Sequence, residues 1–267
     1  MALRGRDRLP LPREMNLLLL LPGFCVGLLI GLTSMGGAAL MTPFLILLLG
    51  MKPAIAVGTD LVYSAATKLV GAWVHWQRGT VDIPLAWRLA SGSIPGSLIG
   101  VWTIVHLRQR GADVDHYIRT GLGIVLVIVA VVIALRSLCV HSVERSRFES
   151  ASLKRWAAIP WGLLVGFAVG FTSVGSGSLM IPYLMLLYPL SSAKAVGTDV
   201  FHGAALVAFT ALLHSSIGDV NWQVAAILLI GSIPGVLVGS CLAAKLPNRA
   251  VGLAVSFVLL ATGAKMV

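Results

Sequence analysis

Charged side chains are scarce in this chain. They make up 11% of its 267 residues, whereas hydrophobic residues make up 57% and the mean hydropathy is +0.92. Soluble domains carry about a quarter charged residues, so this composition predicts an all-α, polytopic integral membrane protein. The net charge of +10 comes from short basic clusters between apolar runs, without interleaved aromatics. That pattern is typical of loops beside anionic lipid and argues against nucleic acid as a partner.

Cysteine and enzyme motifs are also lacking. Cys25, Cys139 and Cys241 are widely spaced, which fits neither a disulfide framework nor a metal site. No Ser-His-Asp order, HExxH, CxxC or phosphate-binding glycine loop occurs. We therefore expect no enzyme activity, no cofactor and no bound metal.

A long internal repeat is what the chain does contain. The stretch from Gly31 to Gly100 recurs at an offset of 139 residues without a gap, and roughly 31 of its 70 pairs are identical. Duplicated apolar halves with helix-breaking Gly and Pro at matching places are typical of secondary transporters. The repeat therefore predicts a binding site between the two halves.

The order of apolar segments predicts the domain organisation. A crossing helix needs about 20 mainly apolar residues. We expect a basic N-terminal segment at 1–15, a first transmembrane repeat at 16–138, a basic linker at 139–156 and a second transmembrane repeat at 157–267. The apolar segments lie at 16–35, 38–50, 54–76, 83–105 and 117–138, then at 157–174, 177–190, 193–215, 222–243 and 250–267.

The segments 38–50 and 177–190 are short and contain Pro43 and Pro182. They are either tilted short spans or half-helices that complete a broken first helix. Five crossings per half make the repeats inverted, and four make them parallel. The segment count favours five, whereas the basic residues of the linker favour four under the positive-inside rule. We expect a helix bundle of about 8–10 segments built from two inverted repeats, with broken or short helices.

Two acidic residues lie well inside apolar segments, Asp60 and Asp199, and they occupy the same position in the two copies. A carboxylate at membrane depth costs a few kcal/mol, so it normally faces a partner or a wet cavity. One interpretation is a pair of proton-coupling groups. The other is a helix N-cap, since a helix could restart after Gly58 and Gly197, and a duplicated cap would also be paired.

Lys68 stands in the first copy alone, opposite Val207. It follows Asp60 by eight residues with Ser64 between them, so the three side chains share one helical stripe. Lys68 is either an ion-pair partner of Asp60, a ligand for an anion, or a lysine that snorkels to the surface. His202, three residues after Asp199, is a further candidate for proton coupling.

Two segments rich in Gly and hydroxyl residues are predicted to break the first helix of each half. Their exposed backbone N–H groups can hold an oxyanion, and non-helical backbone is tolerated at membrane depth only where protein or a water-filled cavity covers it. The alternative is close helix packing through small residues. The predicted anion-binding residues are Thr33, Ser34, Gly36 and Gly37 in the first copy, and Thr172, Ser173, Gly175 and Ser176 in the second.

These motifs resemble the TauE/SafE sulfite-exporter family. The resemblance covers roughly 16–110 and 157–260, and the order and duplication of the motifs carry it. Two positions depart from the family pattern: many members carry a neutral residue where Asp60 and Asp199 stand, and Gly37 is replaced by Ser176 in the second half. The motifs are Gly31-x-Thr33-Ser34-x-Gly36-Gly37 before Pro43, Ala56-Val57-Gly58-Thr59-Asp60, His75-x-x-Arg78-Gly79-x-Val81-Asp82, and Gly92-Ser93-Ile94-Pro95-Gly96-x-x-x-Gly100, with their second copies except at Arg78 and Asp82.

The resemblance implies a multi-pass carrier of the bacterial inner membrane that moves small anions, often outward. Thr59 and Thr198 would join the two breaks in lining its site. We expect an exporter of sulfite, sulfoacetate or other organosulfonates, with Asp60, Asp199 and His202 as the candidates for coupling it to protons. Its partners would be a small sulfite, sulfonate or carboxylate anion and the lipid bilayer, and a homodimer is left open. The alternatives are a passive anion channel and a membrane assembly subunit that transports nothing.

Overall fold

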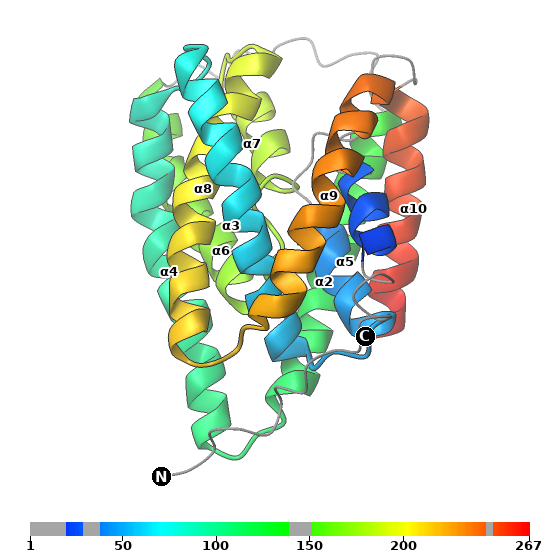
Figure 1. Ribbon diagram of the computed structural model, residues 1–267. Coiled ribbons are helices and arrows are strands. Elements are labelled where there is room, and N and C mark those ends of the chain that lie inside the picture. Colours follow the sequence, from blue (N-terminus) through cyan, green and yellow to red (C-terminus); the bar gives the residue numbers. More distant parts are fainter. Residues whose placement is uncertain (1–19, 29–37, 139–150, 244–247) are drawn as a thin grey trace.

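The computed structural model describes residues 20–28, 38–138, 151–243 and 248–267, and every regular element within these ranges is helical (Figure 1). The predicted all-α bundle is therefore confirmed. The helical residues 20–28 come first. They are followed by α2 (Ala38–Leu47), α3 (Pro53–Gln77), α4 (Ile83–Gln109), α5 (Val114–Leu138), α6 (Ala151–Thr172), α7 (Met180–Leu187), α8 (Ser192–Ser216), α9 (Trp222–Ala243) and α10 (Asn248–Met266).

Several of these helices are suited to a membrane. Within the described ranges, Val114–Leu135, Ser192–Ser216 and Trp222–Gly239 are long and apolar enough to cross one, and Ala157–Thr172 and Gly252–Met266 are shorter apolar helices. In contrast, α2 has 10 residues and α7 has 8. At about 1.5 Å per residue neither can cross a hydrocarbon core about 30 Å thick, so both fit the half-helix interpretation.

The helices α3 and α8 begin well before the paired acidic residues. Pro53 occupies the first turn of α3, whose N-cap is Lys52, and proline suits a position whose N–H has no helical partner. The N-cap of α8 is Ser191, whose hydroxyl accepts a hydrogen bond from the backbone N–H of Lys194 at 3.3 Å. Both helices then run unbroken through Asp60 and Asp199. The N-cap interpretation of these two carboxylates is therefore wrong.

The helices α3 and α8 pack side by side and run in opposite directions (Figure 1). The start of α3 meets the turn after α8, because a Cβ on Gly58 would overlap the carbonyl oxygen of Asp219. The turn after α3 meets the start of α8 in the same way, since a Cβ on Gly197 would lie against the carbonyl oxygen of Thr80. Gly58 is equivalent to Gly197, and Thr80 is equivalent to Asp219, at the repeat offset of 139 residues. The two contacts therefore mirror each other, as contacts do across a two-fold interface.

Glycines also interlock the first half (residues 20–138) with the second half (residues 151–267). The helix α4 packs along α6, and α9 packs in the same manner along residues 20–28. Added Cβ atoms at these contacts would meet the backbone of the facing helix. The glycines are Gly92, Gly96 and Gly100 of α4 with Gly162, Gly166 and Gly170 of α6, and Gly231 and Gly235 of α9 with Gly23 and Gly27.

The antiparallel course of equivalent helices favours the inverted relation between the repeats, which stays a prediction. The predicted domain boundaries likewise stay a prediction, although α6 begins at Ala151, inside the stretch predicted as linker. The packing brings α3 and α8 together, and the segment between α6 and α7 contacts both helices.

Candidate functional site

The chain leaves the helical conformation between α6 and α7, at residues 173–179. Ser173 has φ +66°, a left-handed conformation that residues other than glycine rarely adopt. Gly175 and Gly177 have φ +138° and +89°, which glycine adopts without a steric penalty. The side chains of Ser173, Ser176 and Ser178 are at most 2% exposed. We call this buried segment the α6–α7 break; it lies where the sequence predicts an interruption.

Asp60 of α3 contacts the α6–α7 break. Its Oδ2 accepts hydrogen bonds from the hydroxyls of Ser173 at 2.7 Å and Thr42 at 2.6 Å. Its Oδ1 accepts a longer one, at 3.2 Å, from the hydroxyl of Ser64. The carboxylate is fully buried, and three hydroxyl donors replace the water it has lost. Such charge-assisted hydrogen bonds are the strong ones.

Lys68 lies two turns further along α3 and contacts the same break. Its ammonium donates a hydrogen bond to the hydroxyl of Ser176 and interacts electrostatically with Asp199 and Asp60. The side chain is 9% exposed, which does not fit a lysine that snorkels to the surface. Both functional interpretations of Lys68, an ion-pair partner and an anion ligand, are compatible with this position.

Asp199 of α8 is the third buried charge at the α6–α7 break. It accepts a hydrogen bond from the backbone N–H of Gly177 and interacts electrostatically with Lys68. Its Oδ1 has no hydrogen-bond partner among the described residues, although the side chain is only 2% exposed. Asp60 and Asp199 hold equivalent positions in sequence, yet Asp60 has three hydroxyl donors and Asp199 keeps an unpartnered oxygen.

His202 lies beside this cluster. Its Nε2 and the hydroxyl of Ser93 are 2.8 Å apart, the ring interacts electrostatically with Lys68, and the side chain is buried. Its Nδ1 has no partner among the described residues. One nitrogen of this buried imidazole is thus bonded and the other is open, which keeps His202 a candidate for passing a proton at the edge of the cluster.

Three other predicted site residues have structural contacts outside this cluster. Thr59 accepts a hydrogen bond from the backbone N–H of Asn221 at 3.0 Å, and Thr198 accepts one from that of Asp82 at 2.9 Å. Each hydroxyl thereby fastens the start of a helix in the opposite half. The hydroxyl of Thr172 donates to the carbonyl of Ala168 at 2.8 Å. The break in the first half, with Thr33, Ser34, Gly36 and Gly37, lies outside the described residues.

The model of the sulfite exporter TauE/SafE family matches residues 19–266. The chain belongs to this family. One relative, the probable membrane transporter protein YjnA of Bacillus subtilis, is 39% identical over 255 residues, which cover 95% of this chain and all of that protein. A second B. subtilis protein, the probable membrane transporter protein YdhB, is 25% identical over 225 residues, 84% of this chain and 89% of that protein.

A probable membrane transporter protein of Xylella fastidiosa strain 9a5c is 27% identical over 246 residues, 87% of this chain and 89% of that protein. No solved structure matches the chain. The family and these relatives together indicate a membrane transporter rather than an enzyme. Within the described ranges, no group of three or more His, Cys, Asp or Glu side chains is placed to hold a metal ion.

In this TauE/SafE protein the two halves differ at three positions that touch one another. Lys68, Ser176 and Gly203 form one contact, and the residues at the equivalent positions are Val207, Gly37 and Ser64. A glycine at 203 leaves room for the lysine, and a serine at 176 accepts its hydrogen bond.

Sequence reasoning did not identify Thr42, Gly177 or Gly203 as parts of this site. The available signal was the loss of identity between copies: Thr42 stands opposite Ile181, and Gly203 stands opposite Ser64. Gly177 stands opposite Ala38, but it contributes a backbone N–H group, which its residue type does not indicate.

Proposed function

We propose that this protein is a secondary carrier for a small anion, with its site where α3 and α8 meet the α6–α7 break. The observation that carries the proposal is that three buried charged groups contact one break. Ser173 contacts Asp60, Ser176 contacts Lys68, and Gly177 contacts Asp199. Buried ionisable residues beside non-helical backbone are typical of transport sites in membrane proteins.

The chemistry of the break suits an oxyanion. Lys68 supplies a positive charge, and the hydroxyls of Ser176 and Ser178 supply donors; Ser178 Oγ has no partner among the described residues. The break can add only those backbone N–H groups that are not already bonded, since the ones of Ser173, Val174, Gly177 and Leu179 donate to other groups of the protein. Successive N–H groups in turn conformations form anion-binding concavities. The side chains of the break are almost completely shielded from solvent. This burial supports a carrier, which opens its site to one side of the membrane at a time, and argues against a channel, which needs a continuous path.

Charge balance supports coupling to protons. With both carboxylates ionised, Asp60, Asp199 and Lys68 together hold one excess negative charge, and a bound anion would add to it. Unpaired charge in a low-dielectric interior is costly, so anion binding favours protonation of one carboxyl group. We assign the proton to Asp199, because its Oδ1 is unpartnered, and a structural role to Asp60, which accepts three hydroxyl hydrogen bonds.

The family description, sulfite exporter, supports the substrate and the direction that we propose. We propose outward transport of sulfite, sulfoacetate or another organosulfonate across the bacterial inner membrane. One cation with hydroxyl donors suits a compact sulfur oxyanion, in which charge is spread over several oxygens that each accept hydrogen bonds.

Counterflow of radiolabelled sulfite and sulfoacetate in proteoliposomes tests the site. We expect Lys68→Gln to reduce counterflow to the level of protein-free liposomes, because it removes the buried positive charge while keeping a polar side chain. The matched control is Lys194→Gln, which removes a positive charge from an exposed position at the start of α8. Wild-type counterflow in Lys68→Gln would refute the site, and absence of counterflow in the wild type for every sulfur oxyanion tested would refute the substrate class.

A further inference from the structure

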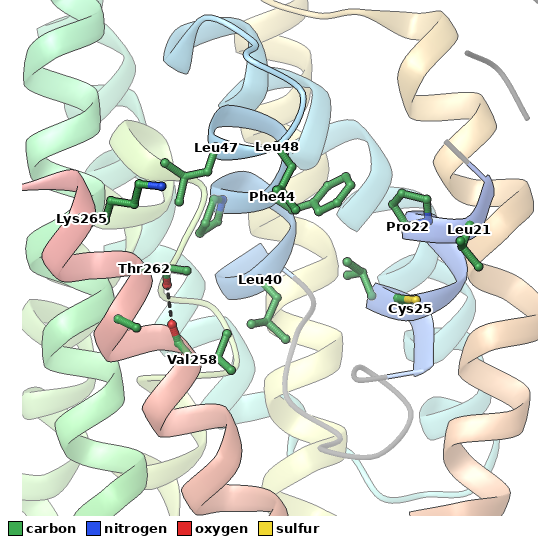
Figure 2. Close-up of a pocket in the computed structure, with 13 residues that line it drawn as sticks. Leu21, Pro22, Cys25, Leu40, Phe44, Leu47, Leu48, Val258, Thr262 and Lys265 are labelled. Carbon is green, nitrogen blue, oxygen red and sulfur yellow. Dashed lines mark hydrogen bonds between the residues drawn. The ribbon is translucent and has the colours of Figure 1, made fainter. Parts of the chain in front are cut away.

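A hollow of about 630 Å³ lies apart from the charged cluster, between residues 20–28, α2 and α10 (Figure 2). Pro22 and Cys25 line it from one side, Phe44 of α2 lines it from another, and Thr262 and Lys265 of α10 close it opposite (Figure 2). It contains none of the buried charges that contact the α6–α7 break.

The lining of this hollow favours hydrocarbon over water. Its side chains are nearly all apolar, and the hydroxyl of Thr262 already donates to the carbonyl oxygens of Val258 at 2.8 Å and Leu259 at 3.1 Å. A buried water needs two to four polar partners, which such a lining does not provide. If the hollow were empty, the side chains that line it would lose dispersion contacts on that side.

The mouth of the hollow faces the bilayer. Three of the side chains that line the hollow are strongly exposed: Leu21 at 66%, Leu48 at 74% and Val258 at 44%. Large apolar side chains at such exposure in a membrane protein are in contact with lipid tails. A lipid acyl chain therefore has direct access to the hollow.

One end of the hollow is positively charged. Lys265 stands in the last turn of α10, and the guanidinium of Arg119 donates a hydrogen bond to its backbone carbonyl at 3.2 Å. Both side chains are exposed. Basic residues near a membrane surface attract anionic lipid, so the two together favour a negatively charged headgroup.

The repeat explains why the hollow occurs in the first half. The residues equivalent to Pro22 and Phe44 in the second half are Trp161 and Tyr183. Their rings stack with centroids 4.9 Å apart and planes inclined by 10°. In the second half the indole of Trp161 fills this position. In the first half the smaller ring of Pro22 leaves the space open.

We propose that this hollow is a binding site for one acyl chain of an anionic phospholipid, with the headgroup at Lys265 and Arg119. This lipid site is independent of the anion site at the α6–α7 break, and either can exist without the other.

Native mass spectrometry of the purified full chain tests the proposal. The protein is incubated with equal amounts of phosphatidylglycerol and phosphatidylcholine that carry identical acyl chains. We expect the wild type to retain one phosphatidylglycerol in preference to phosphatidylcholine. Pro22→Trp should lose the bound lipid, because its indole fills the hollow as Trp161 fills the second half. Phe257→Trp, on the exposed face of α10 and outside the lining, is the matched control and should retain it.

The headgroup contact has its own pair of variants. Lys265→Gln should still bind lipid but lose the preference for phosphatidylglycerol, whereas Lys194→Gln should keep that preference. Thermal melting gives a second readout that does not depend on detergent removal: phosphatidylglycerol should raise the melting temperature of the wild type more than that of Lys265→Gln. Equal lipid retention by the wild type and Pro22→Trp, or a lipid-free dimer that Pro22→Trp converts to monomer, would overturn the proposal.

Discussion

The ammonium of Lys68 lies 3.0 Å from the point at which a Cβ atom on Gly203 would stand. The same Cβ would lie 2.6 Å from the hydroxyl oxygen of Ser176. Glycine at position 203 therefore provides the space in which a lysine of the first half meets a serine of the second. At the equivalent positions, Ser64, Val207 and Gly37 stand instead, so Lys68 has no cationic counterpart at position 207.

Gly203→Ala should impair anion binding without unfolding the protein. The added methyl group meets the ends of two side chains rather than a rigid backbone, so Lys68 and Ser176 would shift and their contact would lengthen. We expect the apparent affinity for the transported anion to fall several-fold, measured as KM for counterflow. Gly71→Ala on α3, whose Cβ would lie 3.1 Å from a methyl group of Val200 and away from the Lys68–Ser176 contact, is the control and should leave KM unchanged. An unchanged KM in Gly203→Ala would contradict this role.

Asp199→Asn and Asp60→Asn should separate proton coupling from structure. If Asp199 carries the proton, its amide variant keeps exchange of labelled for unlabelled anion but loses accumulation driven by an imposed pH gradient. Asp60→Asn should lower thermal stability instead, because hydrogen bonds to a charged group contribute about 1.5–3 kcal/mol each and Asp60 accepts three. Gradient-driven accumulation by Asp199→Asn at the wild-type level would show that the proton is carried elsewhere.

Ser173 combines a strained backbone with a hydrogen bond, and two substitutions distinguish them. A left-handed conformation costs a residue with a Cβ about 1–2 kcal/mol, and Ser173 has φ +66° while donating to Asp60. Ser173→Ala loses the hydrogen bond and keeps the strain, whereas Ser173→Gly loses both. We therefore expect Ser173→Gly to melt at a higher temperature than Ser173→Ala. The opposite order would show that the break relaxes once the hydroxyl is gone.

Gly96→Ala should destabilise the contact between the halves. Its Cβ would overlap the carbonyl oxygen of Leu163 on α6, and overpacking of this kind typically costs about 1–3 kcal/mol. A thermal melt should show a clear decrease in melting temperature. Gly71→Ala should be neutral or slightly stabilising, because alanine is the better helix former by about 1 kcal/mol. Equal melting temperatures for the two variants would argue that α4 and α6 separate easily.

The helices and the α6–α7 break could be predicted because they depend on local sequence patterns. Apolar segments predicted the ends of α2 to α5 and of α7 to α10 closely, because hydrophobic runs of sufficient length and helix-breaking Gly and Pro act locally. The helix α6 instead begins at Ala151, ahead of the predicted segment 157–174. The break after Thr172 and the depth of Asp60 and Asp199 were predictable for the same reason. The two N-cap interpretations failed because Pro53 and Ser191 start α3 and α8 about two turns earlier.

Residue types and their positions along each helix were thus determined by the sequence: two equivalent carboxylates, one unmatched lysine and the break that follows α6. The tertiary structure alone decided which of them meet. Asp60 contacts Ser173 across 113 residues, and Lys68 contacts Ser176 across 108. Periodicity within a helix carries no information about such distant neighbours, because they are set by how α3, α6 and α8 pack. The same packing places the hydroxyls of Thr59 and Thr198 in hydrogen bonds between the halves. It also leaves the hollow beside Pro22 unfilled.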